Sequence, residues 1–434
     1  MLRGTRAVVA KLFKQAWASK ILRSVGVVVS GTAAAQIITL LFTPLVTRIY
    51  GPEIFGLFGV FVAVINLTIP LAALAYPLAV VLPAHNREAI ALVRLSVLLS
   101  IIISLLFGTF FWMAKDLLVE LFDIEPLKDF ILFIPFAMLF AVLLQLAMQW
   151  LIRMKEFRLI ARSAVIHSLI LNVAKVGVGL LYPFGVALIA VATMGYALHA
   201  ALLAGSAIFA FARSHRDESA SSPLSPFRAA RKYIDFPLYR APQSFISDLS
   251  QGLPILLLSG LFGPVAAGYY AISKMSMGVP SVLVGKALRD VLYPHLAEAF
   301  RNGECLYRPL VRSTTLLAFI GALPFGVVVF YGPLLFSWIF GSEWVAAGEY
   351  ARWLAIFFYF NLINKPSFAA VPVLGLQKEL LLYEIGSIAL KALGLFAGFF
   401  VFESDLWAVA LFSMFGAASY VFMIFWVAFR SKVK

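Results

Sequence analysis

The sequence predicts an all-α polytopic membrane protein with about twelve transmembrane helices, arranged as two parallel lobes of six helices each. Three observations predict this class. The 434-residue chain is 62% hydrophobic and only 13% charged, with a mean hydropathy of +0.95, so too little polar surface exists to cover a soluble domain. Its lysines and arginines fall mainly in alternate gaps between apolar runs, and a Gly-Pro motif occurs twice, 212 residues apart.

The apolar runs define the expected helices in chain order. A spanning helix needs roughly 20 mostly apolar residues, and runs of that length occur about twelve times. The expected spans are 25–47, 57–82, 89–113, 130–151, 163–182, 185–211, 241–261, 266–292, 313–340, 353–374, 380–402 and 406–429. Because twelve is an even number, both ends of the chain should lie on the same side of the membrane.

The first part of the chain, residues 1–24, is expected to form a basic amphipathic helix ahead of the first span. It places six lysines and arginines among valine, leucine, phenylalanine and tryptophan. Such a spacing is typical of a helix that lies on an anionic membrane surface, with its apolar side chains inserted and its basic ones at the headgroups. No cleavable signal peptide is evident in this stretch.

The distribution of Lys and Arg between the loops predicts the orientation. Loops on the side of the N-terminus carry 24 of these residues, whereas loops on the other side carry four. This asymmetry places both termini in the cytoplasm. The longest loop, 213–240, contains a Ser- and Pro-rich stretch and is expected to be a cytoplasmic linker. It separates an N-lobe of six helices, 25–212, from a C-lobe of six helices, 241–434.

Matching residues in the two halves indicate an internal duplication. The Gly-Pro-x-x-x-Gly pattern of residues 51–56 recurs at 263–268, and Lys175 matches Lys391 at an offset of 216. Two halves of six helices enter the membrane in the same direction. The repeats would therefore be parallel and related by an axis along the membrane normal.

Seven basic residues inside the apolar runs are the candidate substrate-binding residues of a cavity. They are Lys175, Lys391, Lys274, Arg94, Lys365, Arg289 and Lys286. A charge at the bilayer centre costs about 2.5–3.5 kcal/mol on the lenient scale, so it normally faces protein or a water-filled interior. Lys175 and Lys391 lie roughly 18 Å into their runs, beyond easy snorkelling. The alternative is a structural charge with a buried partner, or, for Arg94, Lys286 and Arg289, snorkelling to the cytoplasmic edge.

One acidic residue and one predicted helix break complete the candidate site. Asp248 lies in the seventh expected span, one turn from Gln251, and is assigned either to proton or cation coupling or to balancing a nearby lysine. Lys365 directly precedes Pro366, where the helix is expected to break, because proline lacks the backbone N–H that a helix interior requires. The basic members of the site outnumber the acidic one, so the predicted cavity is suited to an anion.

No catalytic or metal-binding constellation emerges from the sequence. His167 and His199 fall within expected helices, where each is interpreted as a satisfied interior group. The single cysteine, Cys305, excludes an internal disulfide and a cysteine-built metal site. The prediction is a protein that is not an enzyme and uses no cofactor. Its basic residues fit topology signals better than a nucleic-acid surface.

Short motifs near the start of each half carry a resemblance to a known family. In the second half they are Tyr233-x-x-Phe236-Pro237-x-Tyr239, Leu249-Ser250-Gln251-x-Leu253-Pro254, Phe262-Gly263-Pro264 and Tyr269. In the first half they are Gly31-Thr32-x-x-x-Gln36, Thr43-Pro44-x-x-Thr47-Arg48-x-Tyr50, Phe55-Gly56 and Leu82-Pro83. Together they resemble the Wzx-type polysaccharide and O-antigen flippases of the multidrug/oligosaccharidyl-lipid/polysaccharide (MOP) exporter superfamily.

This resemblance implies a two-lobed bundle around a central cavity that opens alternately to each side of the bacterial inner membrane. It implies a lipid-linked oligosaccharide as substrate, carried on undecaprenyl diphosphate, with membrane lipids and polysaccharide-assembly proteins as partners in O-antigen and lipopolysaccharide synthesis. Two alternatives stay open. One is a cation-coupled drug exporter of the same superfamily, and the other is a polytopic glycan polymerase or glycosyltransferase.

Overall fold

The computed structural model describes residues 2–122, 128, 130–216, 226–302 and 305–433, and within them the chain is helical and contains no strand. The helices of the first half are α1 (Leu2–Ala72), α2 (Tyr76–Ala79), α3 (Asn86–Phe122), α4 (Phe133–Arg153), α5 (Phe157–Leu181), α6 (Gly185–Arg216) and α7 (Pro226–Lys232). Those of the second half are α8 (Ala241–Phe262), α9 (Pro264–Arg301), α10 (Tyr307–Phe340), α11 (Val345–Ile363), α12 (Lys365–Leu374), α13 (Gln377–Phe400) and α14 (Asp405–Val433).

All twelve predicted spans fall on helices, although two of them share one helix. Ten described segments are long and apolar enough to cross a membrane, and the first, Ser30–Ala72, contains two predicted spans. Helix α9 contains a further predicted span. The predicted break near Pro366 is confirmed, because α11 ends at Ile363 and α12 begins at Lys365. The all-α polytopic fold class is therefore confirmed.

The expected loop between the first two spans is a sharp turn inside α1. Gly51 has a φ of 68° and a ψ of 175°, a conformation that glycine adopts readily and other residues rarely do. Pro52 follows at once, and its fixed φ suits the first turn of the next helical segment. The chain therefore reverses direction here with a single non-helical residue, which the apolar pattern alone does not reveal.

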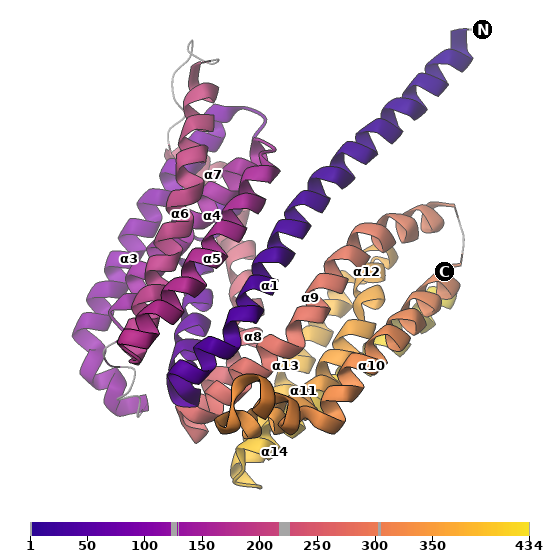
Figure 1. Cartoon of the computed structure of the whole chain (residues 1–434). Helices are drawn as coiled ribbons and strands as arrows, with labels where there is room; N and C mark the ends of the chain where they lie inside the picture. Colours follow the sequence, from indigo (N-terminus) through magenta and orange to yellow (C-terminus); the bar gives the residue numbers. More distant parts are fainter. Residues whose placement is uncertain (1, 123–127, 129, 217–225, 303–304, 434) are drawn as a thin grey trace.

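The N-terminal segment continues into the first span. Residues 2–29 form the beginning of α1, and no non-helical residue separates them from the span, whereas the side chains of residues 1–29 lie outside the described part. Figure 1 shows α1 extending well beyond its neighbours, with the N- and C-termini toward the same end of the bundle. The location of residues 1–24 on a membrane surface stays a prediction.

The helices form two groups with the same internal packing. In the first half α4 packs on α3 and α6, and α6 also packs on α5. In the second half α11 packs on α10 and α14, and α14 also packs on α13. Figure 1 shows the two groups converging at the end away from the termini and diverging toward the termini. This correspondence supports duplication of a six-helix unit.

The largest core joins the two groups where they converge. Its buried side chains come from α1, α6, α8, α9, α10, α11, α13 and α14, and Trp344 and Tyr350 are its largest fully buried members. A second core, around Leu92, Met138 and Leu151, lies within the first half. The halves are thus held together by apolar packing at one end.

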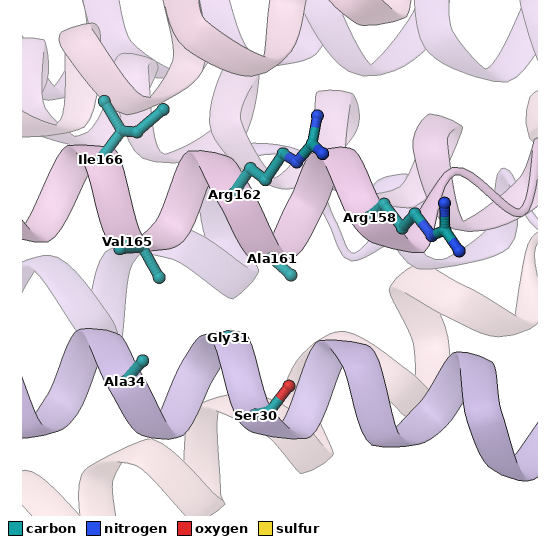
Figure 2. Close-up of a pocket in the computed structure, with 8 residues that line it drawn as sticks. All are labelled: Ser30, Gly31, Ala34, Arg158, Ala161, Arg162, Val165 and Ile166. Carbon is teal, nitrogen blue, oxygen red and sulfur yellow. The ribbon is translucent and has the colours of Figure 1, made fainter.

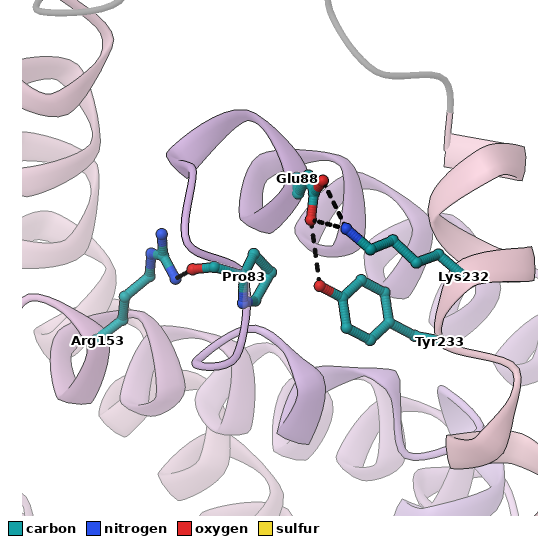
Figure 3. Close-up of polar contacts among 5 residues, drawn as sticks. All are labelled: Pro83, Glu88, Arg153, Lys232 and Tyr233. Carbon is teal, nitrogen blue, oxygen red and sulfur yellow. Dashed lines mark hydrogen bonds and ion pairs between the residues drawn. The ribbon is translucent and has the colours of Figure 1, made fainter.

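The described part of the predicted linker is helical and docks on the first half. The Ser- and Pro-rich residues 217–225 lie outside the description, but α7 and a π-helical turn, Phe236–Arg240, lead into α8. Lys232 donates to both carboxylate oxygens of Glu88 at 2.7 Å, and the Tyr233 hydroxyl donates to the same carboxylate at 3.2 Å (Figure 3). The hydrogen bond to Glu88 raises the pKa of Lys232, so this ammonium stays charged at neutral pH.

Substituting Glu88→Gln is expected to loosen α7 while leaving the bundle folded. The Lys232 side chain is 54% exposed, so its ion pair contributes little to stability, and we expect the unfolding temperature of the purified protein to fall by about 2 °C or less. Proteolytic nicking between α6 and α8 should become faster. Restored protection in the reversed pair Glu88→Lys with Lys232→Glu would confirm the ion pair, and unchanged nicking in Glu88→Gln would contradict it.

Candidate functional site

The deep lysines separate into a pair and a single residue. Lys274 on α9 and Lys391 on α13 lie in the second half, close enough for their ammonium groups to repel each other. Lys175 lies in the first half, six residues before the end of α5 at Leu181. Since α5 begins at Phe157, earlier than predicted, Lys175 lies farther toward the converging end than the sequence indicated.

The paired lysines are held by backbone and by apolar packing. Lys274 Nζ donates to the carbonyl of Gln251 on α8 at 2.6 Å and lies 5.9 Å from the centre of the Tyr270 ring. The stem of Lys391 packs against Gly416 of α14, where an added Cβ would lie 3.4 Å from the lysine Cδ. Both side chains are partly buried. The structure thus brings two predicted cations together from different helices.

Aromatic rings surround this pair. Phe412 lies 6.3 Å from Tyr270 and 5.4 Å from Phe357, measured between ring centres, and Phe357 lies 5.3 Å from Tyr420. Asn361 donates to the Tyr420 hydroxyl at 2.8 Å. The two lysines and four rings are together called the C-lobe cluster. Its members are Lys274, Lys391, Tyr270, Phe357, Phe412 and Tyr420.

Acidic side chains do not neutralise the C-lobe cluster. Glu384, seven residues before Lys391 on α13, attracts that lysine from a distance but forms no ion pair with it among the described residues. Asp248, on α8, also has no described ion-pair partner, so the predicted balancing of a lysine by Asp248 is not formed in this conformation. The cluster therefore retains a net positive charge.

The first half contains a related arrangement around Lys175. Its ammonium lies 4.6 Å from the centre of the Phe58 ring. Phe58 and Tyr270 are separated by the same 212 residues as the two Gly-Pro motifs, so each half places a lysine over the equivalent ring. In the first half the lysine comes from α5, whereas in the second it comes from α9. This offset was the signal that could have identified both rings from the sequence.

Polar groups between α1 and α5 lie one to two turns from Lys175. Thr39 and Ser168 hydroxyls are 3.0 Å apart, and the Asn172 side-chain amide donates to the Thr39 hydroxyl at 3.1 Å. The Tyr50 hydroxyl donates to the backbone carbonyl of Lys175 at 3.0 Å. These bonds fix α5 against α1, which holds the lysine in place.

His167 and His199 are not the separate interior groups that the sequence suggested. Their rings stack between α5 and α6 with centres 4.2 Å apart and an angle of 12°. Both Nε2 atoms are buried, and neither has a hydrogen-bond partner in the described part of the chain, although the backbone of Gly195 lies nearby. Residues 32 apart in sequence, on helices of unknown rotation, gave no signal of this contact.

The remaining predicted cations lie elsewhere. Arg94 is exposed on α3, on the same helical face as Leu98 and Leu105, which are 53% and 66% exposed, so it lies on a face suited to lipid. Lys365 is partly buried at the break between α11 and α12. Lys286 and Arg289 lie on α9, but their side chains are outside the described part.

The two Gly-Pro motifs meet each other at the converging end. A Cβ on Gly56 would overlap the Pro264 carbonyl, and a Cβ on Gly268 would overlap the Pro52 carbonyl. These four residues are called the outer seam. The contact is reciprocal, as expected for two copies related by a two-fold axis. Glycine is required at both positions because the helix backbones touch.

Two further contacts close the same end. Arg48 donates to the carbonyls of Trp338 and Ile339 at 3.0 and 3.3 Å, where a cation also favours the negative end of α10. The Trp344 indole N–H donates to the Thr47 carbonyl at 3.3 Å. The sequence placed Arg48 only as a loop charge. Its contacts show why the structure is closed at the end away from the termini.

Comparison with known proteins assigns the chain to a family. A family model described as "Polysaccharide biosynthesis protein" matches residues 45–349. The chain belongs to this family. The match spans both halves and the linker, so it covers α1 through α11 and includes most of the described site. No match is found among curated protein sequences.

Solved structures share the fold of this family member. The lipid II flippase MurJ, in an inward closed conformation, matches with a TM-score of 0.69 and 12% identity over 92% of this chain and 86% of its own. An inward-facing MATE family multidrug transporter of the MOP superfamily gives 0.65 and 12% over 94% of both chains. A MOP superfamily transporter from Pyrococcus furiosus, described as having a binding pocket of reverse polarity, gives 0.57 and 13% over 94% and 95%.

Proposed function

We propose that this polysaccharide biosynthesis family member translocates an isoprenoid-diphosphate-linked oligosaccharide across the bacterial inner membrane by alternating access. The observation that carries the proposal is the C-lobe cluster, in which Lys274 and Lys391 repel each other and have no described carboxylate partner. Two adjacent cations inside a membrane protein are costly unless an anionic ligand binds between them. A diphosphate supplies that charge, and lysine binds phosphate as a point charge.

The aromatic rings of the same cluster favour a saccharide as the second part of the substrate. Tyr270, Phe357, Phe412 and Tyr420 offer flat apolar faces, and the Tyr420 hydroxyl and Asn361 amide offer polar groups beside them. Binding sites combine a mainly apolar lining with a few placed polar groups in this way. The diphosphate would bind at the lysines, and the first sugars would lie against the rings.

The closed outer seam supports the proposed conformational cycle. Contacts between the halves lie at the end away from the termini, whereas the helices diverge toward the termini (Figure 1). With both termini in the cytoplasm, as the Lys and Arg distribution predicts, this conformation is open to the side on which lipid-linked sugars are made. A reporter fused to the C-terminus should be active only as a cytoplasmic reporter, and the opposite result would contradict the proposed orientation.

Transport of a purified substrate tests the proposal directly. In proteoliposomes containing an undecaprenyl-diphosphate-linked oligosaccharide, we expect the wild-type protein to accelerate its movement between leaflets, measured by access of an added glycosidase. Lys175→Met should slow this movement by about tenfold, because one charged contact is lost, and Lys175→Arg should retain most of it. Lys378→Met, at an exposed surface lysine, is the matched control.

A cation-coupled drug exporter is the second candidate, and one observation favours it. Asp248 is a partly buried carboxylate on α8 without a described ion-pair partner, which is suited to a proton or an organic cation. Drug efflux that requires Asp248, together with no movement of lipid-linked sugar in proteoliposomes, would reverse the order of the two candidates. An enzymatic role as a polymerase or glycosyltransferase would be supported only by sugar transfer from the purified protein.

A further inference from the structure

A cavity outside the C-lobe cluster lies between α1 and α5, on the side of the bundle nearer the termini. Its volume is about 580 Å³. The lining residues are Ser30, Gly31, Ala34, Arg158, Ala161, Arg162, Val165 and Ile166 (Figure 2). Neither the family nor the proposed transport function assigns a role to this cavity.

Two small residues create the shape of the cavity. Gly31 of α1 lies against Ala161 of α5, and a Cβ on Gly31 would lie 2.5 Å from the Ala161 Cβ. The helices therefore touch at one point. Figure 2 shows Val165 pointing from α5 toward Ala34 of α1, while the two arginines extend from α5 away from that crossing.

The positive charge at the cavity is uncompensated among the described residues. Arg158 and Arg162 are one helical turn apart, both are exposed, and neither forms an ion pair within the described part of the chain. Residues 30–47 of α1, which face α5, contain no charged residue. Guanidinium groups spaced in this way bind phosphate oxygens in a bidentate fashion.

An apolar stripe on α5 continues from the arginine pair. The side chains of Ile166, Leu169 and Val173 follow Arg162 at helical spacing and are 47%, 48% and 52% exposed. They lie on a different face of α5 from Ser168 and Asn172, which bond to α1. The cavity therefore joins a phosphate-binding end to a surface suited to a hydrocarbon chain.

We propose that this cavity binds an anionic phospholipid of the cytoplasmic leaflet. Its phosphate binds Arg158 and Arg162, and one acyl chain lies along Ile166, Leu169 and Val173. Basic pockets between transmembrane helices on the cytoplasmic side are suited to such headgroups. A lipid-linked sugar fits less well, because Ser30 is the only uncharged polar side chain in the lining and a saccharide would leave its hydroxyls unpaired.

Lipid binding to the full-length protein tests this inference. In nanodiscs of phosphatidylcholine, we expect fluorescent phosphatidylglycerol to bind roughly thirtyfold more weakly to the double variant Arg158→Ala, Arg162→Ala than to wild type, because two charged contacts are lost. The matched control is Arg308→Ala with Arg312→Ala. These arginines share the spacing, the exposure and the predicted cytoplasmic position on α10, and this control should bind as wild type does. The lysine pair Arg158→Lys, Arg162→Lys should retain most of the binding.

Three outcomes would overturn the inference. Equal weakening in the α10 control would reduce the effect to general surface charge. Equal binding of a fluorescent zwitterionic lipid would remove the role of the anionic headgroup. Tighter binding of undecaprenyl diphosphate than of phosphatidylglycerol at this cavity would assign it to the carrier lipid. Because the assay measures lipid binding and not translocation, it can fail while the proposed transport function holds, and the reverse is also true.

Discussion

Replacing Lys274 and Lys391 together by methionine is expected to abolish export of the lipid-linked oligosaccharide without unfolding the protein. Each lysine would make a charged contact with the diphosphate, and losing two such contacts lowers affinity by about 10²- to 10⁴-fold. Methionine keeps the length and apolar character of the stems. The measurement is substrate movement in proteoliposomes, with binding of the same substrate to purified protein as a second reading.

The stability of this double variant separates a binding role from a structural one. The two ammonium groups repel each other and have no described carboxylate partner, so their removal should leave the unfolding temperature unchanged or raise it. A marked loss of stability would show that the lysines maintain the fold. Full export in the double variant would exclude the C-lobe cluster as the diphosphate site.

Substituting Gly268→Val is expected to hold the outer seam open and stop transport. The added side chain would overlap the Pro52 carbonyl of α1, so the two helix backbones cannot approach to their present distance. Overpacking of this kind costs about 1–3 kcal/mol, which shifts the balance toward the outward-open state by about tenfold or more. The protein should remain abundant in the membrane, because an outward-open state retains the packing within each half.

A cysteine in the seam can report this change. In a Cys305→Ser background, Thr47→Cys is fully buried beside Trp344, and an impermeant maleimide should label it faster when Gly268→Val is added. Gly260→Val on α8 is the matched control, since no atom lies within 4 Å of a Cβ at that position. Unchanged labelling with normal export would show that the seam does not limit opening.

The sequence predicted those features that depend on one helix or on the repeat. Apolar runs located every span, and the charge distribution and the offset of 212 residues indicated two equivalent halves. It placed Lys274 and Lys391 inside the membrane because that requires only depth along a helix. It did not place them side by side, since this depends on how α9 and α13 rotate about their axes. The stacked His167 and His199 were missed for the same reason.

The sequence was least informative where a local conformation replaces a loop. The turn at Gly51 uses one residue in a left-handed conformation, so the hydropathy pattern alone expected a loop between two helices. Lys175 lies nearer the converging end than expected because α5 begins at Phe157 with residues that are polar in composition. Helix boundaries depend on tertiary packing, which hydropathy does not record.

The outer seam has the form of a homodimer interface contained in one chain. Each half presents the same glycine and the same proline carbonyl to the other, so patch meets equivalent patch as in a two-fold symmetric dimer. The interface lies far along α1 and α9 from the covalent connection between Arg216 and Pro226 (Figure 1). Two separate polypeptides, cut between these residues, therefore contain every group needed to assemble the transporter by association of its halves.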